Sequence, residues 1–152
     1  MRDVTEQDAS ALLAAPLLCE DCEDWKPSRT SKGLLEAGCG LISREGVNLR
    51  LYVDMRFRRT GKTNGRFYMF SIFRRQPYGQ ERIYQLDIRQ YPVTPRDHHL
   101  LPHEHIGSAR QIGDAEWLNW TYDQVLAHFC ARTNVTFIPQ LPHPDEFRLR
   151  GQ

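Results

Sequence analysis

The residues best suited to chemistry lie close together, because four of the six histidines fall between positions 98 and 105: His98, His99, His103 and His105. Histidine has the side-chain pKa closest to neutrality, so it exchanges protons readily near pH 7 and binds transition metals when neutral. No other part of the chain concentrates reactive side chains to this degree. The cluster therefore predicts a site for proton transfer or for metal binding.

The spacing within the cluster favours a shared surface for two of these rings. If residues 101–106 are extended, His103 and His105 point to one face and Glu104 to the other, with the two histidine Cα atoms about 7 Å apart. Two imidazoles placed side by side could be two ligands of a divalent metal, with a third from His98, His99 or Asp87. Alternatively, they could act as an acid and a base on either side of a phosphodiester.

Ribonuclease chemistry without a metal needs a base for the 2′-hydroxyl, an acid for the leaving oxygen and a cation for the charge on phosphorus. We expect His103 and His105 to transfer the protons, with Arg89 and Arg82 supplying positive charge and Tyr84 a stacking or donor group. Asp87 completes this candidate catalytic set. The alternative is a loop whose histidines hydrogen-bond to backbone carbonyls and shape a turn. No cofactor is predicted.

Charge is unevenly distributed along the chain, although its net charge is only +1. Residues 1–43 carry 4 basic and 8 acidic side chains, residues 44–89 carry 11 and 4, and residues 90–152 carry 5 and 7. A basic middle section attracts phosphate backbones or an acidic protein face, although arginine is also common on a solvated sheet. The candidate substrate-binding residues are Arg56, Arg58, Arg74, Arg82, His98 and His99.

The four cysteines offer a second, weaker motif. Cys19 and Cys22 have the two-residue gap of a zinc knuckle or a thioredoxin-type redox pair, and Cys39 could supply a third thiolate. A fourth ligand at knuckle spacing is missing, so an acidic, solvated loop that ends in a buried Trp25 is the alternative. We expect all four cysteines to be reduced, with Cys39 and Cys130 as small core residues.

The pattern of apolar residues predicts several strands in succession. Apolar and polar residues alternate over 47–57 and 81–90, and aromatic and β-branched residues fill 66–74, which favours a central strand there. Short turns separate these runs, and no crossover helix intervenes, so an antiparallel arrangement is expected. Residues 106–112 fit either a short edge strand or a loop, and 147–150 fit an edge strand or a tail.

Two helices are expected beside the strands. Thr121 and Gln124 form a capping box for a helix over 122–132, and Asn134 suits a left-handed C-terminal position. Thr5 is placed to cap a shorter N-terminal helix that ends before Pro16. The predicted fold is α+β: one domain over 1–152, with an antiparallel β-meander of about five or six strands packed against a C-terminal helix and a short N-terminal helix.

The composition also limits the setting of the protein. No run approaches the 18 or so apolar residues of a membrane span, and the first residues lack a signal-peptide pattern. We therefore expect a cytoplasmic protein that has no membrane contact. The oligomeric state is left open.

The order of several motifs resembles a group of small uncharacterised bacterial and phage proteins that share a Leu-Asp strand followed by Pro-His-x-His. The matching motifs here are Tyr-Gln-Leu-Asp-Ile at 84–88, Pro-His-Glu-His-Ile at 102–106, Trp117, the expected helix at 122–129 and Asn-Val-Thr-Phe at 134–137. This resemblance covers residues 5–138. More distantly, the meander and the Pro-His-x-His element are similar to TumE-type toxins of toxin–antitoxin systems, which implies a growth-inhibiting activity on RNA and a cognate antitoxin.

Three hypotheses follow from the sequence. The first is a toxin-like or defence-related protein that acts on RNA, as a metal-independent ribonuclease with a histidine pair. The second is a protein-interaction module without catalysis, such as a phage or mobile-element inhibitor that docks a basic sheet face on an acidic partner. The third is a metalloprotein that uses the histidine cluster.

Overall fold

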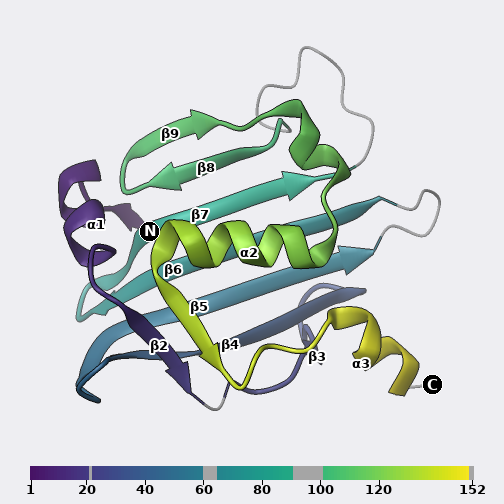
Figure 1. The fold of residues 1–152 in the computed structure, drawn as a ribbon, viewed down its shortest axis with the longest axis horizontal. Helices are drawn as coiled ribbons and strands as arrows, with labels where there is room; N and C mark the ends of the chain where they lie inside the picture. Colours follow the sequence, from purple (N-terminus) through teal and green to yellow (C-terminus); the bar gives the residue numbers. More distant parts are fainter. Residues whose placement is uncertain (21, 60–64, 91–100, 151–152) are drawn as a thin grey trace.

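The computed structural model describes residues 1–20, 22–59, 65–90 and 101–150 (Figure 1). His98 and His99 lie outside these residues. In chain order the elements are β1 (Arg2–Asp3), α1 (Glu6–Leu12), β2 (Leu17–Glu20), β3 (Lys26–Pro27), β4 (Leu34–Ser43), β5 (Asn48–Arg59), β6 (Arg66–Gln76), β7 (Gly79–Arg89), β8 (His103–Ile106), β9 (Ala109–Ile112), the 3-10 helix η2 (Ala115–Asn119), α2 (Tyr122–Thr133), β10 (Val135–Ile138) and α3 (Pro144–Arg150).

All the described strands belong to one mixed sheet. Its main order is β10-β2-β4-β5-β6-β7-β8-β9, while β1 pairs with β7 and β3 pairs with β4. Every neighbouring pair from β2 to β9 in that order is antiparallel, which confirms the α+β prediction with its meander and two helices. Two parallel pairings, β1 with β7 and β10 with β2, enlarge the sheet beyond the five or six strands expected.

The two sides of the sheet differ because α2 crosses only one of them (Figure 1). On β5, for example, Leu51, Val53, Met55 and Phe57 are buried while the residues between them are half-buried. We call the side against α2 the helix face and the opposite side the outer face. By register and alternation, the outer-face residues of the central strands are Tyr52, Asp54, Arg56, Arg58, Phe67, Met69, Ser71, Phe73, Arg75, Gln85, Asp87, Arg89, His103 and His105.

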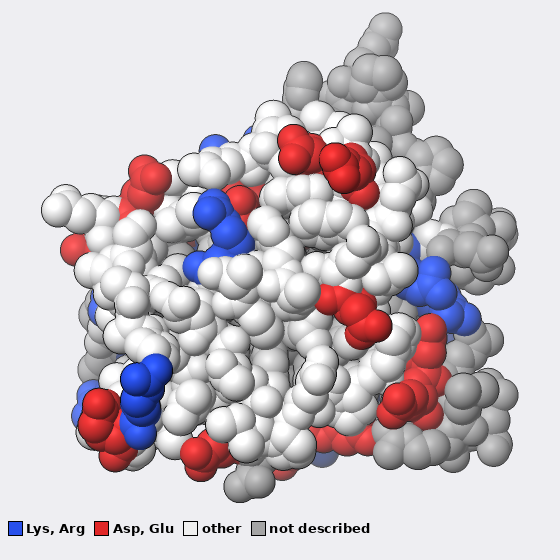
Figure 2. Space-filling view, viewed as in Figure 1, with Lys and Arg blue, Asp and Glu red and all other residues white. Residues whose placement is uncertain are grey.

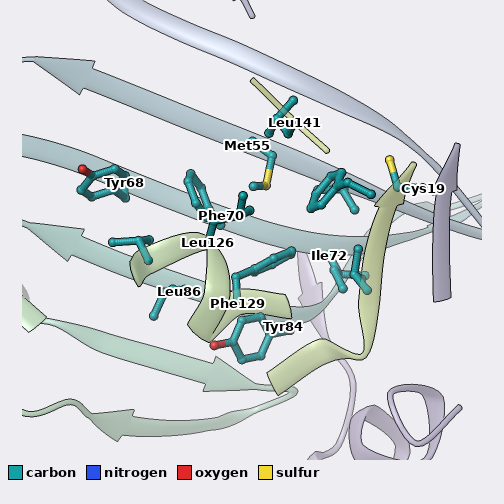
Figure 3. Packing of buried hydrophobic residues seen from close by; sticks show 14 of the residues in the cluster. Cys19, Met55, Tyr68, Phe70, Ile72, Tyr84, Leu86, Leu126, Phe129 and Leu141 are labelled. Atoms are coloured by element: carbon teal, nitrogen blue, oxygen red, sulfur yellow. The ribbon is translucent and has the colours of Figure 1, made fainter. Parts of the chain in front are cut away.

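The helix face contains the hydrophobic core, with α2 packed across it. Thr121 and Gln124 form the expected capping box, and Asn134 ends the helix in the left-handed conformation. Phe129 of α2 packs edge-on against Phe70 of β6 and tilted against Tyr84 of β7, with ring centroids 5.9 and 5.8 Å apart. Figure 3 shows these rings together with Leu126 in the centre of the core. Burial of aromatic rings in such contacts stabilises the packing of α2 on the sheet.

The N-terminal segment closes one end of the sheet, beside the hairpin of β8 and β9 (Figure 1). Thr5 accepts a hydrogen bond from the Asp8 backbone, as expected for the cap of α1. Gly107, in the turn after β8, has φ +55°, and a Cβ atom there would collide with the backbone carbonyl oxygens of Val4 and Thr5. Glycine is therefore required for this close approach.

Two short segments are now assigned. Residues 109–112, which fitted either a strand or a loop, form the edge strand β9. Residues 147–150, expected to be an edge strand or a tail, are instead part of α3. Pro144 is the first residue of this helix, and the acidic side chains of Asp145 and Glu146 stabilise its first turn. Among the described residues, no helix is long and apolar enough to cross a membrane.

Candidate functional site

His103 and His105 lie next to each other on the outer face, at the positions expected from an extended strand. Their rings meet edge to face with centroids 5.1 Å apart. The register places His103 opposite Asp87 and His105 opposite Gln85 of β7. The strand therefore brings two imidazoles and one carboxylate together.

His103 is held firmly in this arrangement. Its side chain is only 7% exposed, and its Nδ1 lies 2.8 Å from the carbonyl oxygen of Leu101. Its Nε2 is 3.9 Å from Oδ2 of Asp87, which is close enough for electrostatic interaction but too long for a hydrogen bond. The Leu101 contact places the proton on Nδ1 when the ring is neutral and fixes the ring orientation.

His105 is less buried and lies in a positive environment. Burial lowers its pKa, and the positive charges of Arg82, His103 and Arg110 lower it further, to about 4, against the opposing charge of Asp3. The ring is therefore neutral at pH 7. Because positively charged groups contribute to this shift, the same position favours a bound anion.

A β-bulge in β7 brings Arg82 to the outer face. Ile72 pairs with Tyr84, whereas Phe73 pairs with Arg82, so the register shifts by one residue between them. Arg82 donates to both carboxylate oxygens of Asp3 at 2.8 and 3.0 Å, and to Oε1 of Gln85 at 3.0 Å. Asp3 of β1 thus holds the guanidinium of Arg82, whose positive charge acts on His105.

Arg89 joins the histidine pair to an aromatic ring. Its Nε donates to Asp87 at 3.3 Å, and its guanidinium carbon lies 5.0 Å from the centre of the Phe67 ring. Its side chain is 31% exposed, so it remains accessible to a ligand. Asp87 therefore accepts a hydrogen bond from Arg89 and also lies near Nε2 of His103.

A second group of aromatic and basic side chains lies farther along the outer face. Tyr52 and Phe73 pack together with ring centroids 5.6 Å apart, and the guanidinium of Arg75 covers Tyr52 at 4.7 Å. Tyr52, Arg75 and Gly40 are among the residues that line an open pocket of about 750 Å³ over β4 and β5. His103 and His105 do not line this pocket, so the pocket is separate from the histidine pair.

Glu104 points to the helix face, where it has a different set of partners. Its carboxylate accepts hydrogen bonds from the Tyr84 hydroxyl at 2.6 Å and from Arg132 at 3.1 and 3.0 Å, and His128 lies 3.4 Å away. Burial raises its pKa, but these hydrogen bonds outweigh burial and lower the pKa to about 2. Tyr84 is fully buried here. The structure therefore separates Tyr84 from the histidine pair, contrary to its place in the predicted catalytic set.

The arginines expected to bind substrate do not form one surface. Arg56 is on the outer face and pairs with Asp54 at 3.2 Å, and Arg58 contacts Ser31. Arg74 follows the alternation of the helix face and pairs with buried Glu81 at 2.8 Å. Only Arg56, Arg58 and Arg82 of this group thus share the outer face.

The cysteines differ from the sequence expectation. Cys19 and Cys39 form a disulfide, so they are not reduced as predicted, while Cys22 and Cys130 are free and half-buried. Burial and the charges of Glu23 and Asp24 raise the pKa of the Cys22 thiol to about 11. Trp25 is buried as expected and packs edge-on against Phe57 and Tyr122.

Several residues of the site were missed from the sequence. Gln85 and Ser71, which are buried and hydrogen-bonded at 2.9 Å, were within reach of the alternation pattern, because Gln85 shares a face with Asp87. Asp3 carries no such signal, since its place depends on the pairing of β1 with the distant β7, whereas Arg110 lies opposite His105 across the short hairpin of β8 and β9. No protein-family model matches the chain, and no curated protein or solved structure shows significant similarity to it.

Proposed function

We propose that this protein binds single-stranded RNA on the outer face of its sheet and uses His105 as the general base that cleaves it. The observation that carries this proposal is the pairing of His103 and His105 on the same face as accessible arginines and aromatic rings. RNA-binding sheets combine these features, because cations bind phosphates and ring faces stack on unpaired bases. Figure 2 shows few Lys and Arg side chains on the helix-covered side, which makes that side a poor match for RNA.

The binding part of the proposal assigns each group a role. Arg56, Arg75 and Arg89 interact with phosphates, while bases contact the half-buried rings of Phe67 and Tyr52 beside the guanidinium groups that lie over them. The pocket beside Tyr52 is large enough for one base, since ligand pockets start at roughly 300 Å³. A strand of RNA would thus extend from this pocket toward β8.

The catalytic part of the proposal starts from the lowered pKa of His105, whose ring is neutral at pH 7. Neutral His105 accepts the proton of a 2′-hydroxyl, and the resulting oxygen attacks phosphorus to form a 2′,3′-cyclic phosphate. The step requires His103 in its doubly protonated form, which gives its Nε2 proton to the departing 5′-oxygen while its Nδ1 stays hydrogen-bonded to Leu101 and Asp87 lies beside Nε2. Arg82 and Arg89 stabilise the charge on the phosphate. A bound phosphate also raises the pKa of His105 toward neutrality, where a general base is most effective.

The resemblance to TumE-type toxins supports the same substrate class. Under this proposal, expression of the protein inhibits growth, and a cognate antitoxin neutralises it by covering the outer face. Its acidic residues would pair with the same arginines that bind phosphate.

The decisive experiment measures cleavage of a labelled, unstructured RNA by purified protein and identifies the product ends. We expect His105→Gln and His103→Gln each to lower the rate by about 10²- to 10⁴-fold. His143→Gln is the matched control, because His143 lies beside α3, where it accepts a hydrogen bond from the Asp145 backbone. This variant should cleave RNA at the wild-type rate. Circular dichroism confirms that each variant is folded.

The outcomes separate this function from its alternative. Cleavage that survives in both histidine variants would exclude the catalytic assignment. RNA binding by the wild-type protein without any cleavage would support the binding part of the proposal and exclude the catalytic part. Wild-type protein that neither binds nor cleaves RNA, yet binds an acidic protein through Arg56 and Arg75, would favour the interaction module instead.

A further inference from the structure

A group of three cysteines at the edge of β4 is independent of the histidine site. β2 pairs with β4 only at Ser43 and Ile42, and β3 joins β4 again only at Glu36 and Leu35. Between these pairings the chain leaves the edge of β4 and returns to it, and Cys39 lies in β4 at this gap. The departing segment carries Cys19 and Cys22, so the topology itself brings the three sulfur atoms together.

The sulfur atoms of Cys19, Cys22 and Cys39 all lie within 4.8 Å of one another. Cys19 is fully buried, whereas Cys22 and Cys39 are half-buried, so the group has a rigid inner side and an accessible outer side. We propose that, when the Cys19–Cys39 disulfide is reduced, these three cysteines bind one zinc ion. The disulfide and the metal-bound group are then two alternative states of one site.

The chemistry of the group favours zinc over the harder divalent cations. Thiolates are soft ligands that select zinc, whereas magnesium and calcium prefer oxygen. Each thiol loses its proton on binding, so three thiols and one Zn²⁺ give a tris-thiolate complex and three protons. Zinc is usually four-coordinate, which leaves one position for water or a further ligand. The carboxylates of Glu23 and Glu20 in the same acidic segment favour a dication nearby.

The test uses the full chain, reduced with a phosphine and then separated from free metal. We expect one zinc per chain by elemental analysis, and a sulfur-to-metal charge-transfer band when Co²⁺ replaces zinc. Cys22→Ser should weaken Co²⁺ binding by on the order of 100-fold and reduce this band. Cys22 is chosen because its side chain is half-buried in a loop, so the variant is expected to fold.

Cys130→Ser is the matched control, because Cys130 is the other free, half-buried cysteine but lies on α2 outside the group. It should bind Co²⁺ with wild-type affinity and the same band. Absence of stoichiometric metal in the reduced chain would overturn the proposal. So would metal binding without a thiolate band, which would place the ion away from the cysteines, or binding that is equal in Cys22→Ser and wild type, which would show that Cys22 is not a ligand.

Discussion

Residues 104 and 105 are neighbours in β8, yet the two faces of the sheet give them opposite chemical environments. Glu104 is saturated with donors, because Tyr84, Arg132 and His128 all approach its carboxylate. His105 has a lowered pKa because it is partly buried near Arg82 and Arg110. A group whose partners satisfy it contributes to stability, whereas a neutral base in a positive environment can bind and react with an anion. The chemical role of each of these two residues therefore depends on the face of the sheet that its side chain occupies, not on its position in the sequence.

The largest effect that distinguishes the faces is expected at Glu104. Glu104→Gln removes the charge that Arg132 and His128 contact, and should lower the free energy of unfolding by about 2 to 3 kcal/mol at pH 7. Glu116→Gln, at an exposed position, is the control and should change it by less than about 0.5 kcal/mol. Urea denaturation measures both. Equal stability of the two variants would mean that the Glu104 network is not structural.

The same residue predicts a loss of stability in acid. The pKa of Glu104 is about 2 in the folded protein, below the value of roughly 4.3 expected when unfolded. Its contribution is therefore complete above about pH 4.3 and is lost as the pH falls toward 2. Glu104→Gln should show a weaker dependence over that range.

A smaller effect is expected from two glycines on the outer face of β4. A Cβ atom at Gly38 would lie 2.6 Å from the carbonyl oxygen of Val53, whereas at Gly40 the nearest atom is 4.0 Å away. Gly38→Ala should therefore destabilise the fold by about 1 to 3 kcal/mol. Gly40→Val should leave stability nearly unchanged but fill the floor of the pocket and weaken RNA binding, as measured by fluorescence anisotropy. Unchanged RNA affinity in Gly40→Val would remove the pocket from the binding surface.

The pKa of His105, which lies on the outer face, predicts a second pH dependence of stability. The folded value of about 4 lies below the ordinary 6.5, so the unfolded chain binds the proton first. Stability should be unaffected by this group above about pH 6.5 and fall by about 1 to 2 kcal/mol as the pH drops to 4, after allowing for screening by water. His105→Gln should flatten the curve in this window. An identical curve for this variant and wild type would show that His105 titrates normally.

The smallest change in stability is expected at Arg56. Its pair with Asp54 is partly exposed, so Arg56→Gln should alter the free energy of unfolding by less than about 0.5 kcal/mol. If Arg56 contacts a phosphate, the same variant lowers RNA affinity and reduces the slope of its salt dependence by about one unit. Titrations at several salt concentrations test this, and an unchanged slope would place the RNA elsewhere.

The local parts of the fold were predictable because they depend on neighbouring residues. Twofold alternation identified the faces of β5, and the Thr121 and Gln124 side chains marked the start of α2. The same alternation correctly placed His103 and His105 on one side. These signals need no information about the distant chain.

The other parts depend on contacts that no local pattern contains. A uniform alternation puts Arg82 and Tyr84 on the same face, but the bulge in β7 sends them to opposite faces. The parallel pairings of β1 and β10 join segments far apart in sequence, and the short strands have too few residues for a clear period. The disulfide between Cys19 and Cys39 likewise follows from the gap along β4.

The pairing of β1 with β7 has a consequence for how the histidine site is assembled. Asp3 orients Arg82, which is 79 positions away, and Val4 and Thr5 lie against Gly107, so the first few residues complete a neighbourhood whose other members are distant in sequence. A chain that lacks residues 1–13 should therefore fold its meander but hold Arg82 through Gln85 without the two hydrogen bonds to Asp3. A synthetic peptide of those residues, added in trans, should restore the missing contact and, under the proposed function, the cleavage of RNA.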